Sequence, residues 1–356
     1  MRIGIYTPYL DTLAGGERYI LTLASYLSKN NSVSLFWDRD RDAVKKRIVD
    51  KFEMDLSDVT FVDNIFDKNV TFLKRFLASK AYDRIIVLSD GSIPLIWSKL
   101  ILHFQTPMEW VQVSGIKTKI KLSRVYEVIC NSAYTKQYID KEFSVKSDII
   151  YPPVTIQNTK HIQKENIILN VGRYGIVQAG SSYKKQEILI DTFKKLVDGG
   201  IKNWKFILIV SIFEQDKEKL ATMQNMIGDY PIEIISNPSN DILWQMYEKS
   251  RIYWHASGYG EDLQAHPDRA EHFGMSTVEA MGTGAVPVVI NAGGQPEIVE
   301  DGKNGFLWET TENLLEKTKE LTLNNSLWIS LSENAKKRAE AFSKEIFIRC
   351  WEKAIV

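Results

Sequence analysis

The chain has 356 residues, of which 44% are hydrophobic and 25% are charged. This composition is that of a globular protein and excludes the disordered and fibrous classes. The length predicts two domains, because one hydrophobic core rarely extends over so many residues. The 45 basic and 45 acidic side chains give a formal net charge of zero, so no overall basic field indicates a nucleic-acid partner.

Cysteine usage and hydropathy indicate the compartment. Cys130 and Cys350 are far apart and lack metal-ligand spacing, which is typical of buried thiols in a reducing compartment. The amino-terminal ten residues read as a strand and carry no signal-peptide pattern. The most apolar region, Ile85–Phe104, is interrupted by Asp90, Pro94 and Lys99 and does not predict a membrane span. We therefore expect a cytoplasmic protein.

Short apolar strands alternate with helices through the first half of the chain. Gly15 and Gly16 precede an amphipathic helix that carries Tyr19 and Leu27 on one face. Strands are predicted at Arg2–Tyr6, Ser32–Trp37, Val59–Val62, Ile85–Ser89, Ile101–Phe104, Val128–Cys130 and Asp148–Tyr151. Repeated strand–helix–strand units predict a doubly wound α/β domain with a parallel sheet.

Three features of this half each have two interpretations. Gly15 and Gly16 form either a plain turn or a place where the backbone closely approaches a ligand. His103 ends an apolar strand at the ligand-binding edge of the sheet, although an isolated histidine on such a strand is more often a core residue. Asn131 and Ser132 either contact a substrate or cap the next helix, and we prefer the cap. No G-x-G-x-x-G motif is present, so the dinucleotide fingerprint is missing.

A basic segment, Lys117–Arg124, contains four cationic side chains among apolar ones. A solvated loop or helix face explains this pattern, and it is the interpretation we favour. The alternative is an amphipathic surface that contacts phosphate groups or anionic lipid. Possible peripheral contact with an anionic membrane surface is therefore kept as a hypothesis.

The second half repeats the α/β pattern of the first. Tyr151–Val154 contains two prolines and precedes a polar stretch, which predicts domains over residues 1–154 and 155–340. Strands are predicted at Ile167–Val171, Lys205–Val210, Ile232–Ile235, Ile252–His255 and Val286–Ile290, and helices at Gln186–Leu196, Lys217–Ile227 and Asp241–Lys249. A final amphipathic helix is predicted at Ala341–Ile355.

A glycine-containing loop, residues 172–185, follows the first strand of the second half. It carries Arg173, Lys184 and Lys185. Cations just after a strand lie at the carboxyl edge of a sheet, where they neutralise a diphosphate and donate hydrogen bonds to it. A surface loop with ordinary basic residues is the alternative.

The stretch Glu271–Glu297 is the strongest candidate for an active site. Ser276–Glu279 fits a capping box, so Glu279 is explained either as a capping carboxylate or as a ligand contact. Phe273, Gly274 and Met275 lead into a helix whose free amides favour anionic or hydroxyl-rich ligands. Gly293 and Gly294, before Pro296, predict a second set of open amides. Together these features suit a nucleotide with sugar and phosphate groups.

The ordered set of these motifs resembles the large retaining GT-B glycosyltransferase family of the family 4 type. The marks are Ala14–Glu17, Asn131-Ser132, Tyr151–Pro153, Gly172-Arg173 with Lys184, Glu271 followed eight positions later by Glu279, Gly293-Gly294 with Glu297, Asp301-Gly302 and Asn304–Phe306. They extend over nearly the whole chain. The resemblance implies two Rossmann-like domains that face a cleft, with the terminal helix, residues 341–356, returning to the first domain.

The resemblance also implies roles for individual residues. Arg173 and Lys184 match a diphosphate-binding pair, although Lys185 stands where the family usually has glycine and leaves the choice of lysine open. Glu279 matches a ribose ligand and Glu271 a residue beside the transferred sugar. The amides of Phe273, Gly274 and Met275, next to Ser276, match donor contacts. Gly15-Gly16 matches a loop at the donor phosphate, and His103 a histidine near the reacting carbon.

The implied function is transfer of a sugar from a UDP- or GDP-sugar to an acceptor hydroxyl, with retention, in polysaccharide, lipopolysaccharide or glycolipid assembly. The resemblance also implies that the protein needs no cofactor and no metal. The insertion Gly258–Ala270 with Asp262, His266 and Asp268 agrees with this expectation, because its spacing matches no strong metal motif. The insertion is expected to line the donor pocket or an interface. Two alternatives stay open, a nucleotide-sugar epimerase on the same fold and a non-catalytic nucleotide-binding subunit.

Overall fold

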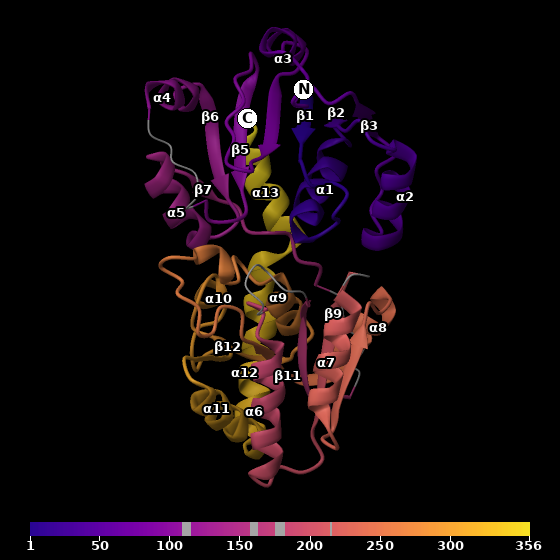
Figure 1. Ribbon diagram of the computed structural model, residues 1–356, viewed down its shortest axis with the longest axis vertical. Helices are drawn as coiled ribbons and strands as arrows, with labels where there is room; N and C mark the ends of the chain where they lie inside the picture. Colours follow the sequence, from indigo (N-terminus) through magenta and orange to yellow (C-terminus); the bar gives the residue numbers. More distant parts are fainter. Residues whose placement is uncertain (109–114, 157–162, 175–181, 214–215) are drawn as a thin grey trace. The chain divides into compact units, whose positions relative to one another are not determined.

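The computed structural model describes residues 1–108, 115–156, 163–174, 182–213 and 216–356. The chain forms two compact units, one of Met1–Pro153 with Lys344–Val356 and one of Val154–Ser343. Within the described residues, each unit is built on one parallel sheet with packed helices (Figure 1). The predicted α/β class with two parallel sheets is confirmed.

The sheet of the first unit has seven strands in the order β3-β2-β1-β4-β5-β6-β7 over the described residues. Its strands are β1 (Arg2–Tyr6), β2 (Ser32–Phe36), β3 (Val59–Val62), β4 (Arg84–Leu88), β5 (Lys99–Phe104), β6 (Val125–Cys130) and β7 (Asp148–Ile149). Its helices are α1 (Gly15–Leu27), α2 (Arg41–Phe52), α3 (Phe72–Ser79), α4 (Ile116–Leu122), α5 (Ala133–Phe143) and α13 (Lys344–Ala354). The order reverses beside β1, as in a doubly wound sheet.

Burial on both faces explains why these strands are continuously apolar. Alternate residues of β4 belong to different cores: Ile86 and Leu88 join the cluster with α1 and α2, whereas Ile85 and Val87 join the cluster with α5. Side chains of a strand alternate between faces, so a sheet covered on both sides needs apolar residues at every position. Ser132 caps α5 by accepting from the amide of Thr135, which confirms the preferred interpretation of that residue.

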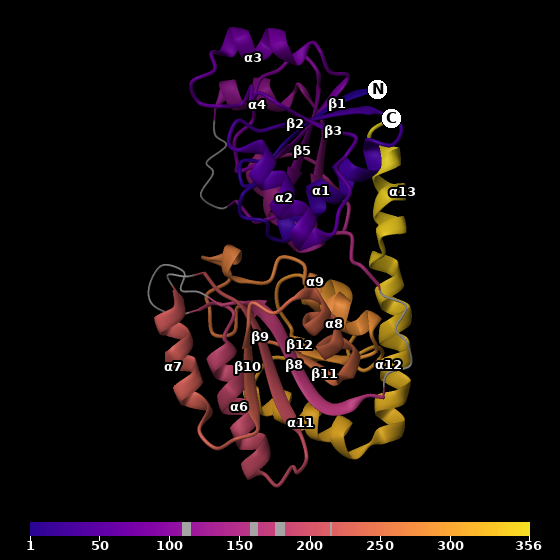
Figure 2. The same cartoon turned by 90° about the vertical axis from the view of Figure 1, so that its right-hand side faces the viewer.

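The carboxyl-terminal helix α13 belongs to the first unit and lies beside α1 (Figures 1 and 2). Trp351 is fully buried, and its indole N–H donates to the Tyr19 hydroxyl at 3.0 Å, which in turn donates to the carbonyl of Ile150 at 3.0 Å. The helix begins at Lys344 and not at the predicted Ala341, because Ser343 is extended and pairs with Val154 in a parallel bridge.

The sheet of the second unit has six strands in the order β10-β9-β8-β11-β12-β13 over the described residues. Its strands are β8 (Glu165–Arg173), β9 (Lys205–Ser211), β10 (Ile232–Ser236), β11 (Ser250–His255), β12 (Val286–Ile290) and β13 (Phe306–Trp308). Its α-helices are α6 (Gln186–Asp198), α7 (Lys217–Ile227), α8 (Asn240–Lys249), α9 (Met275–Gly282), α10 (Gln295–Ile298), α11 (Thr311–Leu323) and α12 (Asn325–Ala339). Short 3-10 turns occur at Pro267–Arg269 and Glu340–Phe342.

The core of the second unit lies between the sheet and its helices. Leu189, Phe193 and Leu196 of α6 pack with Phe206, Trp254 and other buried strand residues. The three-residue strand β13 was not predicted, since so short a segment has no measurable periodicity. Among the described residues, no helix combines the length and the apolar character that crossing a bilayer requires.

The contact between Trp351 and Tyr19 predicts that α13 contributes to the stability of the first unit. Trp351→Ala should lower the free energy of unfolding by about 3–5 kcal/mol, because it leaves a cavity and removes a donor from the Tyr19 hydroxyl. Urea unfolding measures the change. Lys353→Ala, at an exposed position of the same helix, is the control and should be nearly neutral. Equal midpoints for the two variants would contradict the docking of α13.

Candidate functional site

The candidate residues of the second unit gather where neighbouring strands end. Arg173 is the last residue of β8, His255 is the last residue of β11, and Gly293 follows β12 by three positions. These strands are adjacent in the order β8-β11-β12 and are paired in parallel. Their carboxyl ends therefore share one edge of the sheet, which is the usual ligand edge of such folds.

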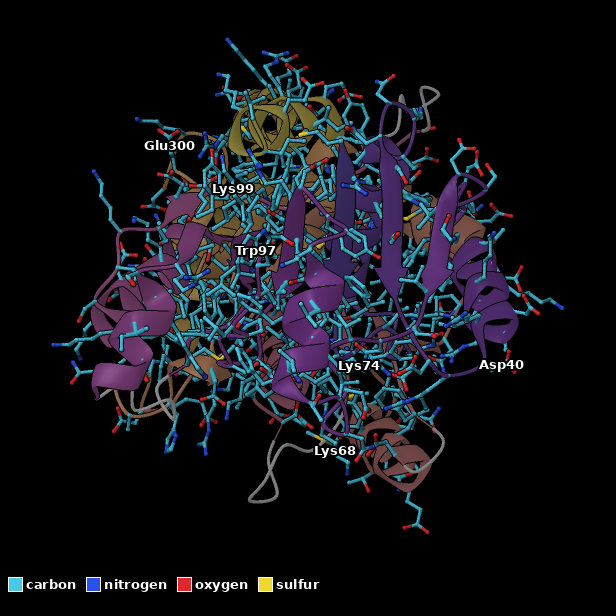
Figure 3. The ribbon with its side chains drawn as sticks, turned by 90° about the horizontal axis from the view of Figure 1, so that it is seen from above. Asp40, Lys68, Lys74, Trp97, Lys99 and Glu300 are labelled. Carbon is cyan, nitrogen blue, oxygen red and sulfur yellow. The ribbon has the colours of Figure 1, made fainter. Side chains whose placement is uncertain are left out.

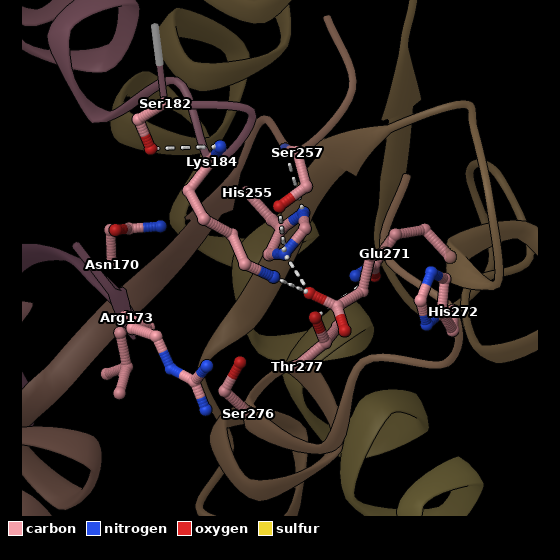
Figure 4. A network of polar contacts seen from close by, with 12 residues as sticks. Asn170, Arg173, Ser182, Lys184, His255, Ser257, Glu271, His272, Ser276 and Thr277 are labelled. Carbon is pink, nitrogen blue, oxygen red and sulfur yellow. Dashed lines mark hydrogen bonds and ion pairs between the residues drawn. The ribbon is translucent and has the colours of Figure 1, made fainter. Parts of the chain in front are cut away.

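Lys184, Glu271 and His255 form a connected group at this edge (Figure 4). The Lys184 ammonium lies 2.6 Å from Oε2 of Glu271, and Nε2 of His255 lies 3.1 Å from the same oxygen. All three side chains are largely buried. The Ser257 amide donates to Nδ1 of His255 at 3.4 Å, so we assign the proton to Nε2, which then donates to Glu271.

Burial and mutual attraction set the charges of this group. Burial alone would raise the pKa of Glu271, but Lys184 and His255 hold it well below its usual range. Burial would lower the pKa of Lys184, yet the facing Glu271 carboxylate raises it overall. Burial lowers the pKa of His255 despite the carboxylate. Near neutral pH the group is therefore an ammonium and a carboxylate, with a neutral imidazole donating to the carboxylate.

Gly293 and Gly294 hold the backbone of the Glu271 loop. The Gly294 amide donates to the carbonyl of Glu271 at 2.7 Å. A Cβ at Gly293 would lie 2.2 Å from that carbonyl oxygen, and one at Gly294 would lie 2.6 Å from the carbonyl oxygen of His272. The prediction that these glycines present open amides is wrong for Gly294, because its N–H is used in this contact. The glycines instead let two backbone segments approach closely.

Helix α9 is held in place by side chains from three other elements. Gly274 is its N-cap, with φ of 120°, so the predicted capping box of Ser276 and Glu279 is wrong. The Tyr253 hydroxyl donates to the Ser276 hydroxyl at 2.7 Å, and the Thr277 hydroxyl donates to Oε1 of Gln295 at 3.0 Å. The Tyr247 hydroxyl donates to Oε2 of Glu279 at 2.9 Å. Met275 follows Gly274 as the first helical residue, and the preceding Phe273 is buried.

The two adjacent lysines have different partners. Lys185 Nζ lies 2.5 Å from Oε1 of Glu261, whose other oxygen pairs with Arg269 at 2.7 Å. Lys185 thus ties the 258–270 insertion to the start of α6, while Lys184 reaches Glu271. This geometry favours Lys184 as the lysine at the candidate site. The middle of the loop that carries them, residues 175–181, lies outside the described residues.

Arg173 lies close to this group but keeps an exposed side chain. Its positive charge acts against the charged form of Lys184, which places the two cations within electrostatic range. Its guanidinium carbon lies 5.8 Å from the centre of the Phe213 ring, and its carbonyl accepts from Gln186 at 3.1 Å. Figure 4 labels Arg173 and Lys184 together with Glu271 and His255. A second cation is therefore available beside the Lys184–Glu271 pair.

The first-unit candidates lie at the carboxyl edge of their own sheet. Gly15 and Gly16 are the first two residues of α1, and a Cβ at Gly16 would lie 2.5 Å from the amide oxygen of Gln105. His103 is fully buried and stacks on Tyr19 at 4.1 Å. Its Nδ1 lies 3.2 Å from the Ile129 carbonyl and its Nε2 lies 2.9 Å from the Gln105 amide nitrogen.

Burial of the His103 ring lowers its pKa to about 3. The structure therefore favours the core interpretation of this histidine, and its contact with a donor sugar stays a prediction. The roles of Gly15 and Gly16 at a donor phosphate likewise stay predictions.

Four supporting residues were not identified from the sequence: His255, Tyr247, Tyr253 and Gln295. The signal for His255 was present, because it ends an apolar strand just as His103 does. The two tyrosines gave no signal, since buried tyrosines in helices and strands are common in any core. Among the described residues, no group of histidine, cysteine or acidic side chains has the arrangement of a metal site.

A family model described as glycosyl transferases group 1 matches residues 154–338, which is more than half of the chain. The chain belongs to this family. Its matched region contains Arg173, Lys184, Glu271 and Glu279. Membership favours a glycosyltransferase over the epimerase and the non-catalytic subunit that the sequence left open.

Two curated relatives show the range of similarity. An α-1,2-mannosyltransferase of Dictyostelium discoideum, named for the donor GDP-Man, is 23% identical over 294 residues, 76% of this chain and 53% of the relative. An uncharacterized glycosyltransferase of Methanocaldococcus jannaschii is 28% identical over 235 residues, 65% of this chain and 57% of the relative. The chain thus spans slightly more than half the length of these relatives.

The solved structure of Anabaena HepE in complex with UDP resembles this chain over its whole length. The TM-score is 0.75 at 18% identity, with 100% of this chain and 99% of HepE covered. At this identity the likeness shows the fold alone. The fold is that of the GT-B glycosyltransferases, as predicted.

The close approach of the two loops predicts a large effect for Gly293→Ala. The added methyl group would overlap the Glu271 carbonyl, so the loop that carries the carboxylate must shift. Gly302→Ala is a matched control, because Gly302 also has a positive φ, 71° against 62°, but open space around it. We expect Gly293→Ala to lower the free energy of unfolding by at least about 1 kcal/mol more than Gly302→Ala does. Equal losses in urea unfolding would show that the contact is unimportant.

The low pKa of Glu271 predicts a pH dependence of stability. Below about pH 4.5 the unfolded chain binds a proton at Glu271 while the folded chain does not, so stability is lost as pH falls. Between pH 5 and 3 the unfolding free energy of the wild type should fall more steeply than that of Glu271→Gln, by up to about 1.4 kcal/mol per pH unit. If the unfolding free energies of the wild type and Glu271→Gln, measured with denaturant, fell in parallel over this pH range, the ion pair would be contradicted.

Proposed function

We propose that the protein is a retaining glycosyltransferase of the family 4 type. It transfers a sugar from a UDP- or GDP-sugar to an acceptor hydroxyl during assembly of a polysaccharide, lipopolysaccharide or glycolipid. The observation that carries this proposal is the buried Lys184–Glu271 pair beside Arg173 at the carboxyl edge of the second sheet. A pair of cations at such an edge suits a diphosphate, and a carboxylate beside them suits sugar hydroxyls.

Binding of the donor exchanges the partners of Lys184. In the structure its ammonium is neutralised by Glu271. A bound diphosphate offers more negative charge, so Lys184 turns to it and leaves Glu271 free to accept hydrogen bonds from the sugar. His255 continues to donate to Glu271 and keeps the carboxylate oriented and ionised. His255 is therefore a positioning residue in this scheme.

The remaining donor contacts come from α9 and the residues around it. The amides of Phe273, Gly274 and Met275 lie at the amino end of the helix, where the peptide dipoles favour phosphate and hydroxyl oxygens. Glu279 accepts hydrogen bonds from the ribose hydroxyls while Tyr247 keeps its carboxylate in place. Ser276 lies in the same turn and is oriented by Tyr253.

The reaction needs no covalent intermediate on the protein. The bond between the anomeric carbon and the diphosphate oxygen breaks, and the acceptor oxygen bonds to the same face of that carbon. The acceptor proton passes to a phosphate oxygen of the leaving nucleotide. Arg173 and Lys184 stabilise the negative charge that grows on the leaving diphosphate, which accelerates the step because the stabilisation is larger in the transition state.

Similar proteins support a nucleotide-sugar donor, but they do not distinguish a UDP-sugar from a GDP-sugar. The Dictyostelium relative is named for GDP-Man, and HepE has been solved with UDP-glucose. We propose that the reaction requires no metal, since two side-chain cations are available for the diphosphate, and that the protein works in the cytoplasm. A thermal-shift screen with UDP, GDP, ADP and their sugars identifies the donor, because a ligand that binds only the folded state raises its stability.

Substitution of the two cations tests the proposal. Lys184→Ala and Arg173→Ala should each reduce transfer from the donor found in the screen by at least about a hundredfold, since each removes charge stabilisation of the leaving group. Lys185→Ala is the matched control, because its ammonium pairs with Glu261 of the insertion. Turnover is measured with and without EDTA.

Full turnover by Lys184→Ala and Arg173→Ala would overturn the diphosphate assignment. An equal loss in Lys185→Ala would show a general effect of the loop. If EDTA abolished turnover and added magnesium restored it, only the proposal that the reaction requires no metal would be overturned.

A further inference from the structure

The outer face of α3 exposes large apolar side chains. Phe72 is 53% exposed, Leu73 62% and Leu77 52%, and Trp97, which packs beside the helix, is 56% exposed. Large apolar side chains of this kind are normally scattered singly over a protein surface. Here four of them lie within one helix and the segment next to it.

These side chains form one continuous surface. Phe72 and Phe76 are one turn apart with ring centres 5.5 Å from each other, and Phe76 contacts the Trp97 ring edge to face, also at 5.5 Å. Leu73 and Leu77 are likewise one turn apart on the neighbouring row of the helix. The Trp97 amide donates to the Ser79 hydroxyl at 2.8 Å, which fixes the tryptophan segment against the end of α3.

The charged side chains within the two segments that form this surface are all cations, and the nearest preceding carboxylates are Asp67 and Asp90. Residues 68–80 carry Lys68, Lys74, Arg75 and Lys80 and no carboxylate, and residues 91–100 carry Lys99 and no carboxylate. The Lys80 ammonium lies 4.2 Å from the centre of the Trp97 ring. Arg75 is used internally, since it donates to the carbonyl of Ile65. Lys68, Lys74, Lys80 and Lys99 are exposed.

The surface lies away from the ligand edge of the first sheet. Trp97 and Lys99 mark the start of β5, so they lie at the amino edge, whereas Gly16 and Gln105 lie at the carboxyl edge. Figure 3 looks onto α3 and labels Lys68, Lys74, Trp97 and Lys99 around it. Occupation of this face would leave the carboxyl edge of the sheet open.

We propose that this face, formed by α3 and Trp97, docks the protein on an anionic lipid surface. Phe72, Leu73, Leu77 and Trp97 would enter the boundary between headgroups and acyl chains, and the lysines would contact lipid phosphates. An apolar helix face with an interfacial tryptophan and flanking lysines suits that boundary. A second copy of the chain fits less well, because two such faces would bring like charges together.

The basic helix α4 is the internal comparison for this proposal. Ile120 is 55% exposed between Lys119 and Lys121, so α4 also presents an apolar side chain among lysines. Leu122 of α4 instead packs against the core cluster of the first unit. Electrostatic attraction alone would favour α4 as much as α3, whereas the larger apolar area favours α3.

Co-sedimentation with lipid vesicles tests the proposal on the full chain. Vesicles of phosphatidylglycerol mixed with phosphatidylcholine are compared with vesicles of phosphatidylcholine alone, at low and high salt. The wild type should bind the anionic vesicles and lose binding as salt rises. The double variant Leu73→Ser with Leu77→Ser should reduce binding at least about tenfold, because two apolar side chains no longer enter the lipid. Lys68→Gln with Lys74→Gln should reduce it about fivefold per lysine.

Ile120→Ser on α4 is the matched control and should bind like the wild type. Urea unfolding should show equal midpoints for all variants, since the substituted side chains are exposed. Binding that is lost in Ile120→Ser and kept in the Leu73 and Leu77 variant would overturn the proposal in favour of α4. No binding to any vesicle would overturn it as well. Analytical ultracentrifugation tests the alternative partner. If the wild type self-associates and the Leu73 and Leu77 variant does not, the face binds a second copy of the chain.

Discussion

Parallel pairing of β8, β11 and β12 is the constraint on which the candidate site depends. It brings the carboxyl ends of three strands, distant in sequence, to one edge of the second sheet. Arg173 and His255 are strand ends, and the loop with Gly293 follows the third strand. The close contact of this loop with the Glu271 backbone then sets where the carboxylate lies. Substitutions that disturb strand pairing and substitutions that disturb the glycine contact should therefore both displace the Glu271 carboxylate.

The Lys184–Glu271 pair connects stability with the proposed chemistry. Two opposite charges are kept in a largely buried place because each offsets the cost of removing the other from water. The same arrangement leaves a charged lysine ready for an anionic ligand and a carboxylate that His255 keeps ionised. In the proposed reaction, a diphosphate replaces Glu271 as the partner of Lys184, so the ammonium stays neutralised while the carboxylate becomes available to the sugar.

The two edges of the first sheet differ in character. The carboxyl edge holds Gly16 and the buried His103 with its Gln105 partner, a polar arrangement enclosed by neighbouring side chains. The amino edge and α3 expose leucine, phenylalanine and Trp97 among lysines. A sequence pattern draws attention to the segment Lys117–Arg124 around α4, which has four cations close together, and not to α3, whose apolar residues resemble an ordinary core face. Only the accessible surface distinguishes an apolar face that is covered from one that is not.

The sequence by itself determined the parallel α/β class and most of the strands, because hydrophobic periodicity is a local property. Its motifs, and the family that they resemble, supplied the candidates Arg173, Lys184, Glu271 and Glu279. Tertiary structure decided which lysine meets Glu271, that Gly274 and not Ser276 caps α9, and that His103 is fully buried while His255 contacts Glu271. These outcomes depend on side chains from strands and loops far apart in the chain. No local pattern encodes such contacts, since they arise only when the parallel strands are aligned.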